Sequence, residues 1–287
     1  MLLPWNQSWK KRWNQTNAVV CGASAGLGAQ LARSIATTNP ACLSLIARRV
    51  EPLQDLRESI QGDSPETRIE IFTADACSRE SLNEAATQIK TNVGNTDLCI
   101  NAVGRSERGT ILDLSVEQTR ESFDLNVVSA LNCIQCFHSG MKSRNSSLVL
   151  IGSLASLFAP RFLGSYAIAK HGLAALAQQA RLELAQEQIS VTLACPGPIA
   201  REDAGTRYAS LQSGDATQTS SIPKESLKPG GGAKIKGLDP IHLAEEILQA
   251  AALRQRLLIR PRKAYLLNAI TALSPSLGDR ILRNRTS

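Results

Sequence analysis

A tyrosine and a lysine four positions apart are the first residues in this chain whose types and spacing could do chemistry. Tyr166 and Lys170 lie in the stretch SYAIAKHG, and a helix would place both side chains on one face. A phenol has a pKa near ~10, and an ammonium beside it favours the phenolate and lowers that pKa. The pair therefore predicts a general acid or base that works near neutral pH. An exposed helical pair without chemistry is the alternative.

A glycine-rich run, CGASAGLG at residues 21–28, directly follows an apolar stretch. Gly22 allows a tight turn, and Gly26 and Gly28 let the backbone approach a pyrophosphate and let a helix pack close to a strand. The N-terminus of such a helix offers free N–H groups to phosphates. Three glycines alone are weak evidence, so a turn without a ligand is the alternative.

Short apolar runs alternate with helix-like segments, which is typical of βαβ units and of a parallel sheet covered on both faces. We expect an α/β fold of the Rossmann type: a doubly wound, seven-stranded parallel sheet with helices on both faces and its ligand at the carboxyl ends of the strands. The expected strands are Ala18–Cys21, Leu43–Ala47, Arg68–Thr73, Asp97–Ile100, Ser147–Ile151, Ser190–Ala194 and Leu257–Ile259.

Taken together, these motifs resemble the short-chain dehydrogenase/reductase family, in its single-domain branch, over about residues 16 to 260. The resemblance implies hydride transfer between a nicotinamide and a carbonyl carbon. It implies that Tyr166 gives or takes the proton and that Ser153 positions the carbonyl oxygen. It further implies that Lys170 tunes Tyr166 and that Asn126, an unfavourable residue inside a helix, holds a water beside the lysine.

The resemblance also implies a dinucleotide site along the carboxyl edge of the sheet. The residues expected to line it are Gly22, Ser24, Gly26, Leu27, Gly28, Asp75, Ala76, Asn101, Gly104, Tyr166, Lys170, Pro196, Gly197 and Ile199. The chain departs from the family pattern at three places. Cys21 stands where threonine is usual, and Ala102-Val103 replaces the two middle residues of the family's Asn-Asn-Ala-Gly. Ala200-Arg201 stands where the family often has a threonine that meets the carboxamide. We expect Ala102-Val103 to alter the wall beside the adenosine slightly and Ala200-Arg201 to change the carboxamide contact. Cys21 should cost only a little stability, because cysteine braces the turn more weakly than threonine.

Two arginines indicate which dinucleotide binds. Arg48 and Arg49 stand where the second strand ends, at a point where an acidic residue would favour NAD. Guanidinium groups suit a 2′-phosphate through charge-assisted hydrogen bonds. The pair predicts NADP(H) as the cofactor, with two solvated arginines as the alternative.

The composition is that of a globular chain, with 287 residues, 43% of them hydrophobic and 20% charged, and no long apolar span. We expect an N-terminal arm at residues 1–15, a catalytic domain at 16–260 with a flexible substrate loop at 201–237, and a basic amphipathic tail at 261–287. The seven cysteines predict reduced thiols and a cytoplasmic location. No metal site is expected, because the C-x-x-C of Cys133 and Cys136 lacks a second ligand pair.

The net charge of +7 is concentrated at the two ends. Trp5, Trp9 and Trp13 recur every four residues beside basic residues, and packing on the domain or on a second subunit is favoured over a membrane interface. The tail predicts one apolar face rimmed by arginine, made of Tyr265, Leu266, Leu267, Ile270, Leu273, Leu277, Ile281 and Leu282. Reversible contact of both ends with an anionic membrane is a hypothesis, whereas nucleic acid is disfavoured because leucines interrupt the basic residues.

The sequence thus predicts an NADP(H)-dependent oxidoreductase that acts on a hydrophobic small-molecule carbonyl or secondary alcohol. A homo-oligomer is expected by analogy with the family. The alternative from another class is a non-catalytic dinucleotide-binding scaffold or regulator with membrane- or partner-binding ends. The substrate segment beyond Pro198 is the least readable part, so the sequence sets neither the substrate nor the direction of reaction.

Overall fold

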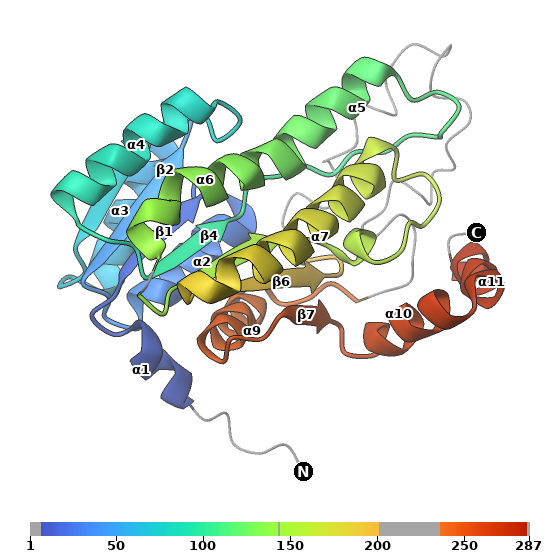
Figure 1. The fold of residues 1–287 in the computed structure, drawn as a ribbon. Coiled ribbons are helices and arrows are strands. Elements are labelled where there is room, and N and C mark those ends of the chain that lie inside the picture. Colours follow the sequence, from blue (N-terminus) through green and yellow to red (C-terminus); the bar gives the residue numbers. More distant parts are fainter. Residues whose placement is uncertain (1–6, 143, 201–235, 286–287) are drawn as a thin grey trace.

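Seven parallel strands form one sheet in the computed structural model, which describes residues 7–142, 144–200 and 236–285 (Figure 1). Their order across the sheet is β3-β2-β1-β4-β5-β6-β7. The strands are β1 (Asn17–Cys21), β2 (Cys42–Ala47), β3 (Ile69–Thr73), β4 (Leu98–Asn101), β5 (Ser147–Ile151), β6 (Ser190–Pro196) and β7 (Leu257–Arg260). All seven expected strands are present, and the predicted doubly wound sheet is confirmed.

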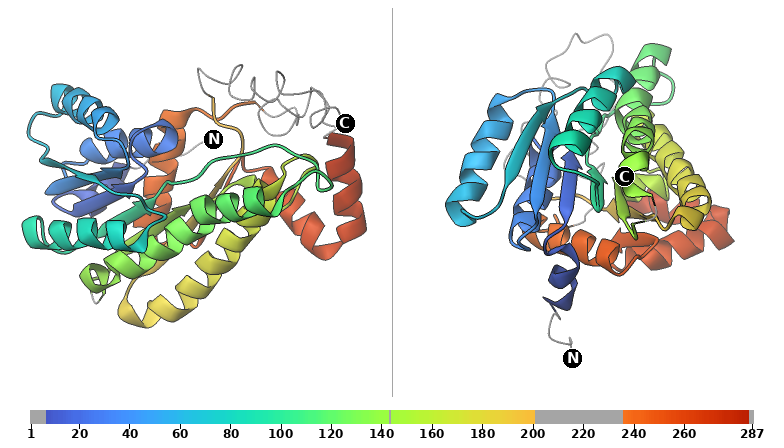
Figure 2. Two further views of the ribbon diagram at one scale, coloured as in Figure 1. Left: turned by 90° about the horizontal axis from the view of Figure 1, so that it is seen from above. Right: turned by 60° about the vertical axis from the view of Figure 1, so that its left-hand side comes forward.

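The sheet is covered on both faces, which explains why most residues of its inner strands are buried rather than only every second one. All six residues of β2 are buried, for example. One face carries α2 (Gly26–Ala36), α3 (Glu51–Asp63) and α9 (Pro240–Ala252), and the other carries α4 (Arg79–Asn92), α6 (Ser129–Met141) and α7 (Ser165–Leu184). The left view of Figure 2 separates the two layers, with teal, green and yellow helices on one side and blue and orange helices on the other.

Shorter elements connect these layers. They are the 3-10 helices η1 (Gln7–Trp9), η3 (Leu154–Ser156) and η4 (Ala185–Glu187), the helices α1 (Lys10–Trp13) and α5 (Val116–Phe123), and the π-helical turn η2 (Asp124–Val128). The turn η2 joins α5 to α6 without a break. Such π-helical turns often occur at functional sites.

The N-terminal arm packs against the domain. Trp13 is fully buried, and its Nε1 donates a hydrogen bond to the backbone oxygen of Leu248 in α9 at 3.1 Å. Trp9 is also buried in the same apolar cluster. These two side chains are therefore not available to face a membrane. The favoured interpretation of the sequence, in which they pack against protein, agrees with this arrangement. Trp5 lies outside the described residues.

A helical hairpin follows β7 and lies at the edge of the molecule, away from the N-terminal arm (Figure 1). It consists of α10 (Ala264–Leu273) and α11 (Pro275–Arg285). The two helices meet closely, because a Cβ on Gly278 would lie only 2.7 Å from Cγ2 of Thr271. Leu267 and Leu282 pack against the main core cluster. The hairpin is thus attached to the domain through its own apolar side chains.

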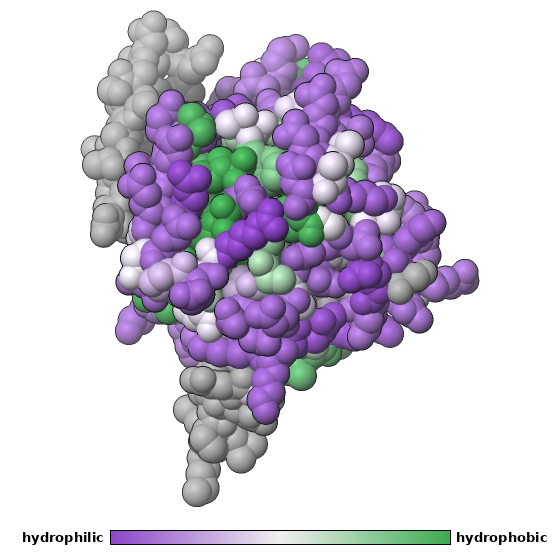
Figure 3. All heavy atoms as spheres, turned by 90° about the vertical axis from the view of Figure 1, so that its left-hand side faces the viewer, coloured by the Kyte–Doolittle hydropathy of each residue, from purple (hydrophilic) through white to green (hydrophobic). Residues whose placement is uncertain are grey.

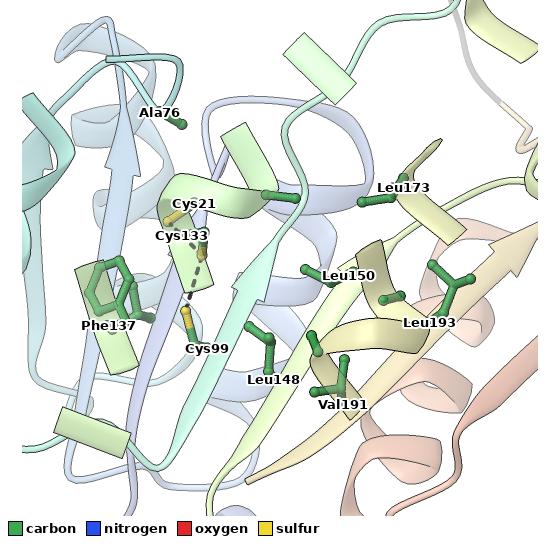
Figure 4. Close-up of a cluster of buried hydrophobic side chains, with 14 of the residues drawn as sticks. Cys21, Ala76, Cys99, Cys133, Phe137, Leu148, Leu150, Leu173, Val191 and Leu193 are labelled. Carbon is green, nitrogen blue, oxygen red and sulfur yellow. Dashed lines mark hydrogen bonds between the residues drawn. The ribbon is translucent and has the colours of Figure 1, made fainter. Parts of the chain in front are cut away.

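Three thiols meet inside the core (Figure 4). Cys133 Sγ on α6 lies 3.4 Å from Cys99 Sγ on β4 and 3.9 Å from Cys21 Sγ at the end of β1. All seven cysteines are free thiols, and Cys21, Cys42, Cys99, Cys133 and Cys195 are buried. The thiol of Cys21 therefore faces the core, where it acts as a small apolar side chain.

The face shown in Figure 3 is mainly hydrophilic, with a group of hydrophobic residues in its middle.

Among the helices of the described residues, none combines the length and the hydropathy that crossing a bilayer requires.

Candidate active site

A large cavity opens at the carboxyl edge of the sheet, where β1 and β4 lie side by side and the winding reverses. Its volume is about 860 Å³. Every residue that the sequence assigned to catalysis or to cofactor binding lines it, with the exception of Asn101. Segments that are far apart along the chain are thus brought to one place.

The glycine-rich turn at the end of β1 has no room for side chains. Gly22 has a φ of +83°, and a Cβ there would lie 2.9 Å from the backbone nitrogen of Val103. A Cβ on Gly28 would lie 2.1 Å from the oxygen of Gly22, which no backbone shift of ordinary size would relieve. Glycine at both positions is therefore required for the first turn of α2 to lie against the end of β1.

The N-terminus of α2 is open toward the cavity. Its N-cap residue is Ala25, so no side chain accepts hydrogen bonds from the first N–H groups of the helix. Ala25, Gly26, Leu27 and Ser24 all line the cavity. Uncapped N–H groups and the positive end of the helix dipole fit the pyrophosphate of a dinucleotide.

Arg48 and Arg49 line the cavity at the end of β2 and are exposed. Within the described part of the chain, neither guanidinium has a hydrogen bond or an ion pair. Asp75, at the end of β3, also lines the cavity, and its Oδ1 accepts a hydrogen bond from the backbone nitrogen of Cys77 at 2.9 Å. Two unpaired cations at this position can bind an anionic group.

Asn101 lies behind the cavity wall. Its side chain is buried, its Oδ1 accepts a hydrogen bond from the nitrogen of Val103 at 3.2 Å, and its Nδ2 donates one to Ser129 Oγ at 3.3 Å. It therefore braces the turn that carries Ala102, Val103 and Gly104, which do line the cavity. A direct contact of Asn101 with a cofactor stays a prediction.

Ser153 follows β5 and begins the 3-10 helix η3. Its Oγ accepts a hydrogen bond from the backbone nitrogen of Ala155 at 3.1 Å, and its own nitrogen donates to Ser156 Oγ at 3.1 Å. This reciprocal cap fixes the side chain in the cavity wall. Because Oγ accepts from Ala155, its hydroxyl hydrogen can point to a carbonyl oxygen.

Tyr166 and Lys170 occupy the first turns of α7, as the spacing predicts. Tyr166 packs against the small cluster of Ala155, Leu163 and Ala167, and Lys170 Nζ lies 5.8 Å from the centroid of its ring. Lys170 is buried, and Nζ donates a hydrogen bond to the backbone oxygen of Ile151 at 2.8 Å. Burial lowers the pKa of Lys170 to about 8, so the ammonium is still mainly protonated at pH 7.

Asn126 lies in the π-helical turn and is fully buried. Its Nδ2 donates to the oxygens of Ser122 at 2.9 Å and Arg105 at 3.2 Å, whereas Oδ1 has no hydrogen-bond partner in the described chain. A Cβ on Gly104 would lie 2.6 Å from that Oδ1 and 3.3 Å from Lys170 Nζ. The two polar groups therefore border one small space, which glycine at 104 leaves open.

The turn after β6 closes the cavity wall. Pro196, Gly197 and Ile199 line it, and the nitrogen of Gly197 donates to the oxygen of Arg260 at 2.7 Å. The nitrogens of Ala200 and Leu238 donate to the oxygens of Leu238 and Pro198, both at 2.8 Å. The predicted loop at 201–237 and the departure at Arg201 lie outside the described residues, apart from 236 and 237.

Sequence reasoning missed one wall of the cavity. Leu266, Leu267, Ile270, Ile281 and Leu282 of the helical hairpin line it. The sequence grouped these five with Tyr265, Leu273 and Leu277 as one apolar face, but the structure divides the group. The amphipathic pattern identified the apolar residues, and only the path of the chain after β7 could show which of them face the cavity.

Comparison with known proteins agrees with this geometry. The short chain dehydrogenase family model matches residues 16–209. An uncharacterized oxidoreductase of Mycobacterium tuberculosis is 30% identical over 186 residues, which are 64% of this chain and 73% of that protein. The farnesol dehydrogenase of Aedes aegypti is 29% identical over 198 residues, which are 67% of this chain and 80% of that protein.

A solved structure shares the fold. L-sorbose reductase from Gluconobacter frateurii, in complex with NADPH and L-sorbose, has a TM-score of 0.73 at 19% identity, covering 86% of this chain and 95% of that one. The family match runs from β1 through β6 and includes all four candidate catalytic side chains. By this match the chain belongs to the short-chain dehydrogenase family of oxidoreductases.

Proposed function

We propose that this protein is an NADP(H)-dependent oxidoreductase that interconverts a hydrophobic carbonyl compound and its secondary alcohol. The bound nicotinamide supplies or accepts the hydride. The observation that carries the proposal is that Ser153, Tyr166, Lys170 and Asn126 line one cavity with the open N-terminus of α2.

The proposed roles follow from the contacts of each side chain. Ser153 donates its hydroxyl hydrogen to the substrate oxygen and holds it beside Tyr166. Tyr166 gives the proton to that oxygen during reduction and takes it during oxidation. The charge of Lys170 stabilises the phenolate, and Asn126 Oδ1 binds the water through which Lys170 and the solvent exchange protons.

The preference for NADP(H) rests on Arg48 and Arg49. Both guanidinium groups are exposed, lack partners in the described chain and border the cavity where the adenosine ribose would lie. They would bind the 2′-phosphate by charge-assisted hydrogen bonds. The NADPH complex of the reductase from Gluconobacter frateurii supports this cofactor by analogy.

The hydrophobic character of the substrate rests on the apolar side chains of the helical hairpin that line the cavity, such as Leu267, Ile270 and Leu282. A farnesol dehydrogenase among the similar proteins is in keeping with it. The exposed side of the helical hairpin carries Leu273 and Leu277 beside Arg280, and we extend the proposal to reversible contact of this side with an anionic membrane. Flotation with liposomes tests this contact, and a protein that stays in the soluble fraction with anionic lipid removes it.

A homo-oligomer is part of the same proposal. The outer faces of α5 and α7 expose Val116, Phe123, Ile168 and Leu182. Apolar groups in such numbers on neighbouring helices are typical of an interface. Sedimentation equilibrium would give the oligomeric state directly.

The first experiment separates the cofactors by calorimetric titration. We expect NADPH to bind at least about tenfold more tightly than NADH, because one charge-assisted hydrogen bond contributes about 1.5–3 kcal/mol. Arg48→Ala and Arg49→Ala should each weaken the binding of NADPH more than the binding of NADH. Arg57→Ala in α3, which lies away from the cavity, is the control and should change neither. Equal affinity for both cofactors would overturn the assignment to NADP(H).

A second variant tests catalysis. Tyr166→Phe should lower kcat by about 10²–10⁴-fold, because it removes the general acid while leaving the ring in place. NADPH binding, measured in the same way, should persist. If the variant keeps most of its activity on a substrate that the wild-type protein turns over, Tyr166 is not the catalytic acid.

A further inference from the structure

The outer half of the cavity is built from hydrocarbon that two different parts of the chain supply. Leu154, Phe158 and Leu163 come from the segment between β5 and α7. Leu267, Ile270 and Leu282, among others, come from the helical hairpin α10–α11. Besides the candidate catalytic and cofactor-binding residues, the cavity lining includes the polar residues Arg105, Ser106, Arg108 and Lys263.

We propose that the hairpin α10–α11 is the specificity-determining wall for an extended hydrocarbon chain of the substrate. The preferred substrates would then be ketones or secondary alcohols with a long apolar chain rather than small polar ones. This inference rests on the proposed function of the same cavity. It adds the part of the substrate that is recognised and the residues that recognise it.

The hairpin has the rigidity that such a wall needs. Ala264 is buried at its start, and Tyr265 Oη accepts a hydrogen bond from the nitrogen of Ile259 at 3.3 Å and donates one to the oxygen of Leu257 at 3.2 Å. At the other end, Gly278 lies directly against Thr271. The helix α10 is thus tied to β7 and α11 is tied to α10, and the apolar wall is formed before any ligand arrives.

The two sides of α10 differ in a way that permits a matched comparison. Ile270 is half-buried and lines the cavity, whereas Leu273, three residues later, is 87% exposed and does not line it. A large side chain at 270 therefore fills the cavity, and the same side chain at 273 extends into solvent. Both positions belong to α10.

The dependence on chain length follows from the hydrophobic effect. Each methylene that enters the apolar half should raise kcat/KM by up to about fourfold until the cavity is full. The series from 2-butanone to 2-dodecanone measures this with NADPH as the reductant. 2-Butanone, the shortest ketone, should be the poorest substrate of the set.

The test compares Ile270→Trp with Leu273→Trp. Ile270→Trp should lower the ratio of kcat/KM for 2-dodecanone over 2-butanone at least about tenfold, because the indole occupies the volume of several methylenes. Leu273→Trp should leave this ratio unchanged. Ile270→Ala should shift the optimum toward longer chains. If the two tryptophan variants behave alike, the inference is overturned.

A binding assay keeps this outcome apart from a failure of the proposed function. N-phenyl-1-naphthylamine is a neutral probe whose fluorescence rises in apolar cavities, and its displacement by the same ketones needs no turnover. Displacement that improves with chain length and weakens in Ile270→Trp alone supports the wall, even if no ketone is reduced. Displacement that does not depend on chain length, in a protein that reduces ketones, overturns the wall and leaves the proposed function standing.

Discussion

The two ends of the cavity differ in whether backbone or apolar side chains form the wall. At the end next to α2 the wall is backbone, and Gly28 approaches Gly22 so closely that not even a methyl group fits between them. At the end next to α10 the wall is side-chain hydrocarbon, such as that of Ile270 and Leu282. A backbone contact this close excludes any residue larger than glycine, whereas apolar packing tolerates exchange among residues of similar volume. The first end can therefore serve one class of cofactor, and the second can be altered residue by residue.

The largest expected effect that tests this difference is at Gly28. Gly28→Ala forces a Cβ to within 2.1 Å of the Gly22 oxygen, so the start of α2 must move away from β1. We expect NADPH affinity to fall at least about 100-fold and the protein to lose about 1–3 kcal/mol of stability through overpacking. Activity should fall equally for short and long ketones. Gly62→Ala, in α3, meets nothing within 4 Å and is the control. Unchanged NADPH binding in Gly28→Ala would contradict the backbone account.

A smaller effect is expected at Gly104. A methyl group there would lie 2.6 Å from Asn126 Oδ1 and would fill the space beside Lys170. Gly104→Ala should lower kcat by about 10–100-fold, within the usual range for loss of assisted proton transfer, and by the same factor for every ketone. Gly109→Ala in the same loop, where the nearest atom is 3.7 Å away, should retain activity. A loss that grows with the chain length of the ketone would mean that position 104 acts on the substrate wall instead.

The smallest effect concerns stability and pH. The folded protein lowers the pKa of Lys170 from 10.5 to about 8, so between these values the unfolded chain binds more protons and stability rises with pH. Below about pH 8 the buried charge destabilises the fold in full. Lys170→Met should therefore be more stable than the wild type at pH 7, by on the order of 1–3 kcal/mol after the lost bond to Ile151 is included.

The pH profile of unfolding checks this prediction. The gain from Lys170→Met should shrink as the pH rises from 8 toward 10.5, as measured by urea unfolding. Lys90→Met removes an exposed lysine from α4 and should show no such trend. A constant difference between wild type and Lys170→Met across this range would mean that Lys170 is not a strained buried cation.

The backbone end of the cavity was open to prediction from the sequence, because its residues are distinctive. Glycines at residues 22, 26 and 28 have few substitutes where φ is positive or a Cβ would collide, and Tyr166 and Lys170 have few substitutes in their chemistry. The strands were predictable too, since buried parallel strands form continuous apolar runs between helices.

The hydrocarbon end could not be predicted in the same way. Ile270 and Leu273 are equally apolar, and nothing in their local pattern tells which one faces a cavity and which faces solvent. That choice depends on where the hairpin turns after β7 and on the contact between Gly278 and Thr271, which are tertiary facts. Asn101 shows the same limit, because the sequence does not indicate that its buried side chain braces the turn at Val103.

Because most of the cysteines are buried, the rate at which their thiols are modified can report how often the domain opens. Cys77 and Cys136 are partly accessible, whereas the other five thiols, including the trio at Cys133, lie inside the sheet and helix layers. Burial raises the pKa of Cys77 to about 11 and also raises that of Cys136, so even the accessible pair reacts slowly near neutral pH. A thiol reagent that labels the remaining five must wait for the sheet to separate from its helices. The rate at which those sulfur atoms become modified would thus time the spontaneous opening of the domain, without any engineered cysteine.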